Sequence, residues 1–389
     1  MSTEFTLPPQ QPLAAQIPVY LEKKVQPRYG CLLEEFEPGM RFQHPRGLTL
    51  FPTLAQEFAG TFMQANPLYL NEPYARLHGF ERLPVSPLLV LAAVLSQGVQ
   101  NLSEQAIAHL GYYHIVFPQP TYVGDTIRAE SEVLSRRWRG PARPGVVRVR
   151  TWGRNQHDQI VVQYERAILI PPGRDDLDTY GEEQVGDSSA SEVTVVKLPS
   201  LTPRPLPPLT GSNTYYEDYQ LGQILAHSNG RTVTEEHIPW SYRLGNTHPL
   251  HNDRLYASAR SGPMSGEPIV YGALVFAWVE GLASRDCSDN ALWDLGYTDG
   301  YHTQPVTAGD TLYAVSRLVD IQAGLMGTGT GILTWQLIGL KNLSARASIE
   351  KYGPALFQPE SGKERGERIL EKVLETERRL LVKRRVYWG

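Results

Sequence analysis

The chain has 389 residues, of which 41% are hydrophobic and 20% are charged, and its formal net charge is −4. This length exceeds what one typical core accommodates, so we expect two domains. An ordinary globular composition with a weak negative charge gives no reason to expect a nucleic acid or an anionic membrane as partner.

Cysteine content and the N-terminal residues bear on the cellular compartment. Cys31 and Cys287 are far apart and lack metal-ligand spacing, which excludes a disulfide framework and fits a reducing compartment. Residues 1–28 are rich in Pro and Gln and lack a basic stretch followed by an apolar run, so we expect an extended arm and no signal peptide. The apolar segment 269–283 is too short to span a membrane. These features predict a cytoplasmic protein.

After the arm, the chain consists of two similar bodies. We expect the first at 29–170 and the second at 214–389, joined by a Pro-, Ser- and acid-rich linker at 171–213 that cannot bury enough surface to order itself. Short blocks recur between the bodies about 182–185 residues apart, which indicates a duplication. The matched blocks are 66–71 with 248–253, 110–112 with 295–297, and 124–126 with 309–311. Glu165-Arg166 matches Glu377-Arg378 at a larger offset, because the second body carries an insertion at about 341–370.

Each body is predicted to hold one long apolar helix followed by strands. The helices are expected at 85–97 and 269–283, and both are apolar nearly all round, so they must be covered on most sides. Alternating apolar and polar residues predict antiparallel strands at 123–134, 146–153 and 160–170, and at 311–319, 332–340 and 373–383. A sheet wrapped around each helix is the simple solution. We therefore predict an α+β double hotdog fold.

A polar loop before the second helix carries the chemistry. It runs Gly245-Asn246-Thr247-His248-Pro249-Leu250-His251-Asn252-Asp253. Its end, the start of the helix (Ile269-Val270-Tyr271-Gly272) and the later Pro305-Val306-Thr307-Ala308-Gly309-Asp310-Thr311 together resemble the MaoC-like (R)-specific enoyl-CoA hydratases. The tandem arrangement and the Asn-Thr start of the loop resemble most the mesaconyl-CoA (2-methylfumaryl-CoA) hydratases, also called β-methylmalyl-CoA dehydratases.

The resemblance implies reversible addition of water to an enoyl thioester of CoA or of an acyl carrier protein, with no metal or redox cofactor. His251 is the expected acid/base, because imidazole titrates near the working pH. The family has Asp five residues before this His, and here the residue is Asn246, which can orient water or thioester but cannot exchange a proton. Either His251 transfers the proton alone, or Asp253 takes the missing role, unless Asp253 only caps the next helix.

Three further residues of the second body are candidates for substrate contact. Gly272 opens the apolar helix, where backbone N–H groups and the helix dipole can stabilise an oxyanion, although helix packing alone also explains a glycine. Tyr271 and His248 are candidate substrate contacts, and a purely structural role for His248 stays open.

The first body lacks this chemistry. Tyr69 replaces the His, Gln64 stands at the acid position, Asn71 replaces the Asp, and Pro87 replaces the Gly and has no N–H to donate. We therefore predict a disabled site that serves as scaffold and as acyl or pantetheine pocket, with Ser86 as a polar contact. One active site per chain follows.

Several alternatives remain from the sequence. The basic cluster 136–139 is interpreted as a solvated hairpin end, with a phosphate contact as the alternative. The His residues of the polar loop lack a further cluster with metal-ligand spacing, so no metal site is expected.

A hotdog thioesterase and a catalytically silent acyl-CoA or acyl-carrier binding module are the rival functions. The repeats can form the hotdog pair within one chain, and a homodimer of whole chains stays open.

Overall fold

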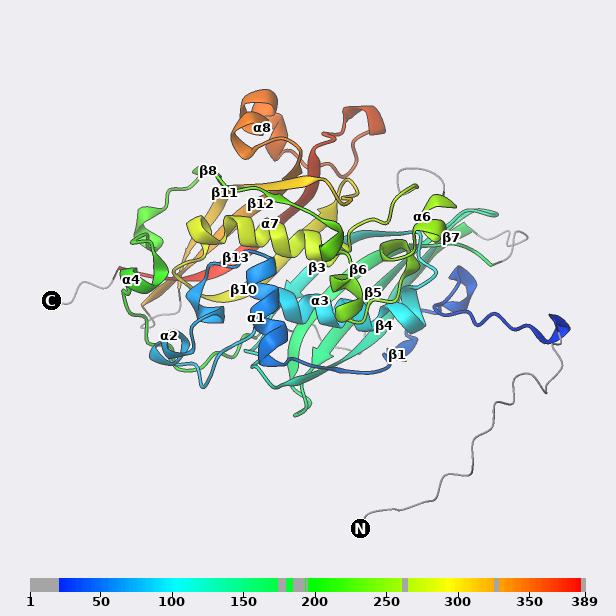
Figure 1. Ribbon diagram of the computed structural model, residues 1–389, viewed down its shortest axis with the longest axis horizontal. Coiled ribbons are helices and arrows are strands. Elements are labelled where there is room, and N and C mark those ends of the chain that lie inside the picture. The colour runs from blue at the N-terminus through cyan, green and yellow to red at the C-terminus, as the bar shows by residue number, and fades with distance from the viewer. Residues whose placement is uncertain are drawn as a thin grey trace, which may run out of the picture.

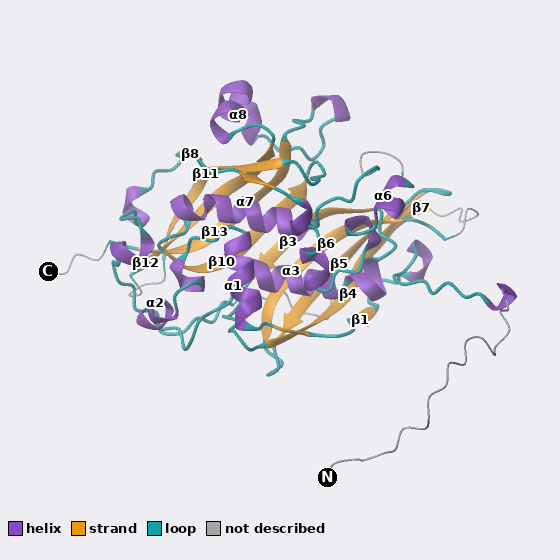
Figure 2. Cartoon of the chain, in the orientation of Figure 1, coloured by secondary structure: helices purple, strands orange, loops and turns teal. Residues whose placement is uncertain are grey.

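Two apolar helices lie side by side against one strongly curved sheet (Figures 1 and 2). The computed structural model describes residues 21–173, 180–184, 193, 195–260, 265–324 and 329–385, so most of the expected arm lies outside the described residues. The helices are α3 (Pro87–Gln97) and α7 (Gly272–Cys287). Every residue of α3 is buried, as the prediction of a helix that is covered on all sides requires. The double hotdog prediction is confirmed.

One antiparallel sheet joins the two repeats. Its strands follow the order β1-β4-β5-β6-β3-β10-β13-β12-β11-β8, with β2 and β7 on β4 and β9 on β11. The first repeat contributes β1 (Arg41–Gln43), β2 (Leu48–Thr49), β3 (Ala108–Val116), β4 (Thr126–Arg139), β5 (Gly145–Arg154) and β6 (Ile160–Ile170). The second contributes β8 (Ile224–Ala226), β9 (Arg231–Thr232), β10 (Ala291–His302), β11 (Thr311–Ala323), β12 (Thr330–Lys341) and β13 (Lys372–Lys383).

Strands β3 and β10 hold the repeats together, and neither was predicted. They pair with each other through registers such as Tyr297 opposite Ile115. Both carry shifts in register along their other partners, so the apolar and polar residues do not alternate cleanly. Gly296 has φ +133°, and a Cβ there would lie 1.9 Å from the carbonyl oxygen of Ile115. The close approach of the two strands therefore requires glycine at this position.

Short helices connect the entry strands of each repeat to its central helix. In the first repeat these are α1 (Pro52–Thr61), η4 (Pro67–Tyr69) and α2 (Glu72–Leu77). In the second they are η7 (Glu235–His237), α5 (Trp240–Arg243), η8 (Pro249–His251) and α6 (Arg254–Ser258). The predicted polar loop 245–253 thus runs from the end of α5 through η8 to the N-cap of α6. Helix α7 continues four residues past its predicted end at 283.

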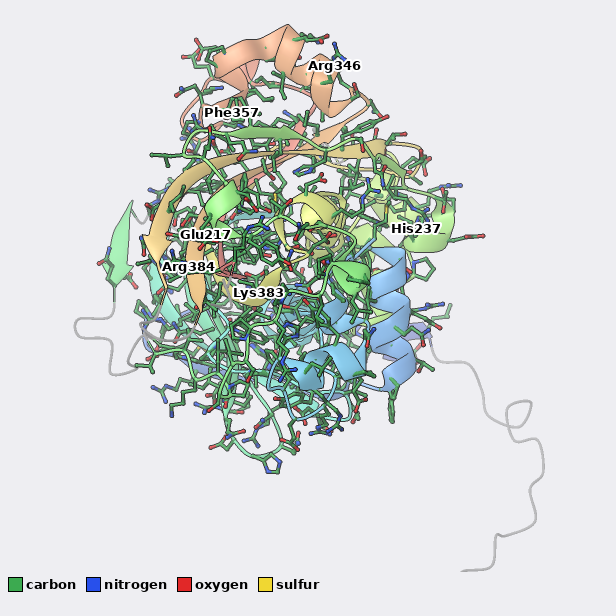
Figure 3. The ribbon with its side chains drawn as sticks, turned by 90° about the vertical axis from the view of Figure 1, so that its left-hand side faces the viewer. Glu217, His237, Arg346, Phe357, Lys383 and Arg384 are labelled. Atoms are coloured by element: carbon green, nitrogen blue, oxygen red, sulfur yellow. The ribbon has the colours of Figure 1, made fainter. Side chains whose placement is uncertain are left out.

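The helical part of the insertion of the second repeat lies on the outer face of the sheet, opposite α7, whereas residues from 360 to 370 line the cavity described below. It contains α8 (Ala345–Tyr352), η9 (Gly353–Phe357) and η10 (Arg365–Glu367). Leu356 and Phe357 pack in a separate cluster with Val315 and Ile338, which point away from α7. Figure 3 shows Arg346 and Phe357 on this outer side. The sequence left the place of the insertion open.

The segment 171–213, expected to be a linker without order, is partly packed where the structure describes it. Strand β7 (Tyr180–Gln184) pairs with β4. Further on, Leu198 and Leu201 pack against the core, and the Thr202 N–H donates to the His78 carbonyl at 3.2 Å. Apolar residues spaced among the prolines supply the burial that composition alone did not suggest. Within the described part of the chain, no helix is both long and apolar enough to cross a membrane.

Candidate active site

A cavity of about 1210 Å³ lies between the repeats at the N-terminus of α7. The second repeat lines it with the polar loop, the start of α7 and the end of β10. The first repeat lines it with the C-terminal end of α3, strand β3 and part of β6. One chain therefore supplies both walls of the site.

His248 shapes the polar loop and is fully hydrogen-bonded itself. Its Nδ1 accepts from the Leu250 N–H at 3.2 Å, which caps η8, and its Nε2 donates to the Ala106 carbonyl at 3.1 Å. Burial lowers its pKa to about 3, so the ring is neutral. In the first repeat Asn66 caps η4 in the same way, by accepting from the Leu68 N–H. These contacts are those of a structural residue, and since His248 also lines the cavity, its contact with substrate stays a prediction.

His251 presents one free ring nitrogen to the cavity. Its Nδ1 lies 3.0 Å from the Ile269 carbonyl oxygen and must donate to it, which leaves Nε2 unprotonated. Burial lowers the pKa of His251 to about 4, so the neutral form dominates at physiological pH. A neutral imidazole with a fixed tautomer and a free Nε2 is suited to take a proton from water.

Asn246 and Tyr271 form the polar wall beside His251. Asn246 is 1% exposed, and its Oδ1 accepts from the His248 N–H at 2.9 Å. Its side chain also hydrogen-bonds to the Tyr271 hydroxyl, which in turn donates to the Ala92 carbonyl of α3 at 3.3 Å. Burial raises the pKa of Tyr271, so it stays a neutral donor. The rings of His251 and Tyr271 are 5.4 Å apart.

Gly272 begins α7 at the cavity wall, where the first helical N–H groups have no carbonyl partner within the helix. A Cβ at this position would lie 2.7 Å from Nε2 of His302. The absence of a side chain thus serves packing as well as access to the backbone.

His302 is a cavity residue that the sequence reasoning missed. It stands at the end of β10, its Nε2 lies 3.3 Å from the Tyr112 hydroxyl, and burial lowers its pKa to about 4. At the repeat offset the first body has Phe117 in its place. A comparison of the two repeats could have identified His302 as a candidate, because it replaces an apolar phenylalanine.

Two predicted site residues lie elsewhere. Asp253 is exposed and accepts from the Tyr256 N–H at 3.0 Å as the cap of α6, and it does not line the cavity. The structure gives it the role of a cap, the alternative weighed from the sequence. Ser86 precedes α3 at the matching position of the first repeat, away from the cavity.

The half-site of the first repeat is closed. Pro87, Phe117 and Trp293 fill the space at the N-terminus of α3, and the Trp293 indole donates to the Phe117 carbonyl at 2.9 Å. What remains is too small for a water molecule. The disabled site predicted from Tyr69, Gln64, Asn71 and Pro87 is thus a filled one.

Part of the basic cluster lies at the outer end of the open cavity. Arg137 and Arg139 line it and are exposed, together with Arg368 of the insertion. Arg136 instead pairs with Glu183. This position supports the interpretation that the basic cluster contacts a phosphate group over the interpretation that it is only a solvated hairpin end. In the part of the chain that the structure describes, no three His, Cys, Asp or Glu side chains are grouped as a metal site would require.

Comparison with known proteins agrees with this geometry. The family model for mesaconyl-CoA hydratase matches residues 18–220, just over half of the chain, and the model for a MaoC-like domain matches 218–335. A β-methylmalyl-CoA dehydratase from Chloroflexus aurantiacus is 29% identical over 80% of this chain and 89% of its own length. A mesaconyl-CoA hydratase from Cereibacter sphaeroides is 29% identical over 84% of this chain and 95% of its own.

Solved structures show the same architecture. A MaoC domain dehydratase from Chloroflexus aurantiacus superposes with a TM-score of 0.77 at 26% identity, covering 93% of this chain and 100% of that one. A double hotdog protein from Mycobacterium tuberculosis gives a TM-score of 0.69 at 20% identity, over 90% and 98%, and supports the fold alone. The chain belongs to the mesaconyl-CoA hydratase family, and its second repeat is a MaoC-like domain.

Proposed function

We propose that the chain reversibly adds water to a short, branched or dicarboxylic α,β-unsaturated acyl-CoA, with mesaconyl-CoA as the leading substrate. The observation that carries the proposal is the free Nε2 of His251, which faces the cavity beside the open N-terminus of α7. The relatives named mesaconyl-CoA hydratase and β-methylmalyl-CoA dehydratase align over most of the chain and support the choice of substrate.

His251 transfers the proton in this reaction. Neutral Nε2 takes a proton from water while the hydroxide adds to Cβ of the enoyl group. The electron pair of the double bond moves onto the thioester oxygen, and the imidazolium then returns the proton to Cα. The sum is the addition of one water with no change in redox state, so no redox cofactor takes part. Asn246 and Tyr271 orient water and thioester through hydrogen bonds, since neither exchanges a proton at neutral pH.

The enolate oxygen is stabilised by the backbone of α7. The Gly272 N–H lies in the first turn of the helix, where the dipole favours negative charge. In the first repeat the corresponding residue is Pro87, which supplies no N–H. This difference supports one active site per chain, built on the second repeat.

The outer end of the cavity suits the CoA part of the substrate. Arg137, Arg139 and Arg368 are exposed there, and the pantetheine arm would reach inward from their phosphate contacts. Because both walls come from one chain, the site needs no second subunit, and a homodimer would be an addition to a complete unit.

A thioesterase would need a carboxylate that activates water for attack on the carbonyl carbon. Asn246 is an amide, and Asp253 caps α6 outside the cavity. Glu360, the acidic residue among the described residues that line the cavity, is buried, pairs with Lys363 and accepts from the Ile369 N–H, so it is engaged within the insertion. The geometry therefore favours hydration over hydrolysis of the thioester.

The test is a paired assay with mesaconyl-CoA and other short enoyl-CoAs. Loss of enoyl-thioester absorbance is followed together with release of free thiol, for the wild type, His251→Ala and the exposed control His157→Ala. We expect loss of absorbance without thiol in the wild type and the control, and a rate at least about 100-fold lower in His251→Ala. Thiol release would indicate a thioesterase. Equal rates in all three proteins would refute the site, and binding without turnover in the wild type would indicate a silent binding module.

A further inference from the structure

Arg166 is a buried cation at the inner wall of the cavity. It lies on β6, is 5% exposed, and its Nη2 donates to the Ser103 hydroxyl at 3.2 Å. Its Nε is buried without a hydrogen-bond partner, and none of the carboxylates that the structure describes forms an ion pair with it. A buried charge without a partner is costly, so such an arrangement calls for a ligand of opposite charge.

The matching arginine of the second repeat has carboxylate partners. Arg378 on β13 is also buried, and its Nη2 lies 2.5 Å from Glu280 and 2.8 Å from Asp294. Glu280 also accepts a hydrogen bond from Gln64, the residue that stands where the second repeat has Asn246. The closed half-site is thus neutralised by two carboxylates of the chain itself, next to the counterpart of the catalytic loop.

The open half-site lacks both carboxylates. At the repeat offset of 185 residues, Leu95 stands where α7 has Glu280, and His109 stands where β10 has Asp294 (280 − 185 = 95; 294 − 185 = 109). Both Leu95 and His109 line the cavity. The ring nitrogens of His109 are buried without partners, and burial lowers its pKa, so it adds a neutral hydrogen-bond donor and no negative charge.

A purely structural explanation for Arg166 is available in the fold. Its Nη2 lies near Gly98, the C-cap of α3, where the helix dipole favours a positive charge. This contact leaves the buried Nε without a partner, whereas a carboxylate in the cavity would pair with the guanidinium directly.

We propose that Arg166, with Ser103 and His109, binds the terminal carboxylate of the acyl group. This inference rests on the proposed function and deepens it: it assigns the residues that select a dicarboxylic over a monocarboxylic enoyl-CoA. The ligand carboxylate takes the place that Glu280 and Asp294 occupy around Arg378. A guanidinium is suited to this task because its planar fork matches a carboxylate.

Two matched substrates test the carboxylate site by turnover. Mesaconyl-CoA and tiglyl-CoA share the branched enoyl skeleton and differ in a terminal carboxylate or methyl group. For Arg166→Met we expect kcat/KM with mesaconyl-CoA to fall by roughly 100-fold or more, and kcat/KM with tiglyl-CoA to change by less than about 3-fold. The control Arg346→Met, on the exposed face of α8, should change neither. An equal fall with both substrates would assign Arg166 a structural role and overturn the proposal.

Binding of saturated analogues separates this inference from the hydratase proposal. Calorimetry with methylsuccinyl-CoA and 2-methylbutanoyl-CoA should show that the wild type prefers the dicarboxylic analogue and that Arg166→Met does not. Leu95→Glu, which places the glutamate of the second repeat beside Arg166, should remove the preference as well. A wild type that binds both analogues equally overturns the carboxylate site, even if it hydrates tiglyl-CoA. A wild type that prefers methylsuccinyl-CoA but hydrates nothing supports the carboxylate site and refutes the hydratase.

Discussion

Substitution by methionine should lower the stability of the protein strongly at Arg378 and hardly at all at Arg166. Arg378→Met leaves Glu280 and Asp294 buried without a cation, and breaking one partner of a buried pair destabilises by about 3–5 kcal/mol. Arg166→Met removes a charge that has no carboxylate partner among the described residues, and methionine can fill the space. We expect the free energy of unfolding to change by less than about 1 kcal/mol there.

The loss in free energy of unfolding caused by Arg378→Met should also depend on pH. Burial raises the pKa of Glu280 and of Asp294, and the loss of the guanidinium removes the charge that opposes this rise. The folded variant then binds more protons than its unfolded chain above pH 4, so its stability falls as pH rises. The difference in free energy of unfolding between the wild type and the variant should therefore be smaller at pH 5 than at pH 8.

Urea denaturation followed by tryptophan fluorescence measures both effects, with the wild type and both variants at pH 5 and pH 8. A similar loss for the two variants would mean that Arg166 has an internal partner equivalent to the carboxylates of Arg378. A loss below about 1 kcal/mol for Arg378→Met would show that the buried network contributes little, and either result would refute the reasoning.

Two further expectations concern the polar loop. Because burial lowers the pKa of His251 to about 4, kcat/KM for hydration should stay level as pH falls from 8 to about 5. It should drop only when the imidazole protonates near pH 4. A pH–rate profile with a midpoint near 6.5 would contradict this expectation. Asp253→Ala should leave kcat within about 3-fold and lower the free energy of unfolding by about 1 kcal/mol, as loss of a helix cap does, whereas a large loss of kcat in a stable protein would return Asp253 to the catalytic group.

Sequence periodicity and internal repetition were sufficient for the fold class, because α3 and nearly all of α7 are buried and strands such as β4 alternate between apolar and polar residues. Strands β3 and β10 were not predicted from the sequence, because their bulges and glycines break the alternation of apolar and polar residues. The residues of the inner cavity wall were not predicted either. Arg166 and Arg378 match in sequence, but their different partners come from other elements of their own repeats and become apparent only in the folded structure.

The continuous sheet through β3 and β10 has an evolutionary consequence. In a symmetric pair of identical single repeats, a glutamate at the position of Glu280 would block both sites at once, because each half would carry it. Within one chain the halves mutate independently. One half could convert its binding site into a buried ion pair that stabilises the fold, while the other kept an arginine free for a ligand. A chain that carries both repeats can thus fill one pocket as part of its core without loss of the other.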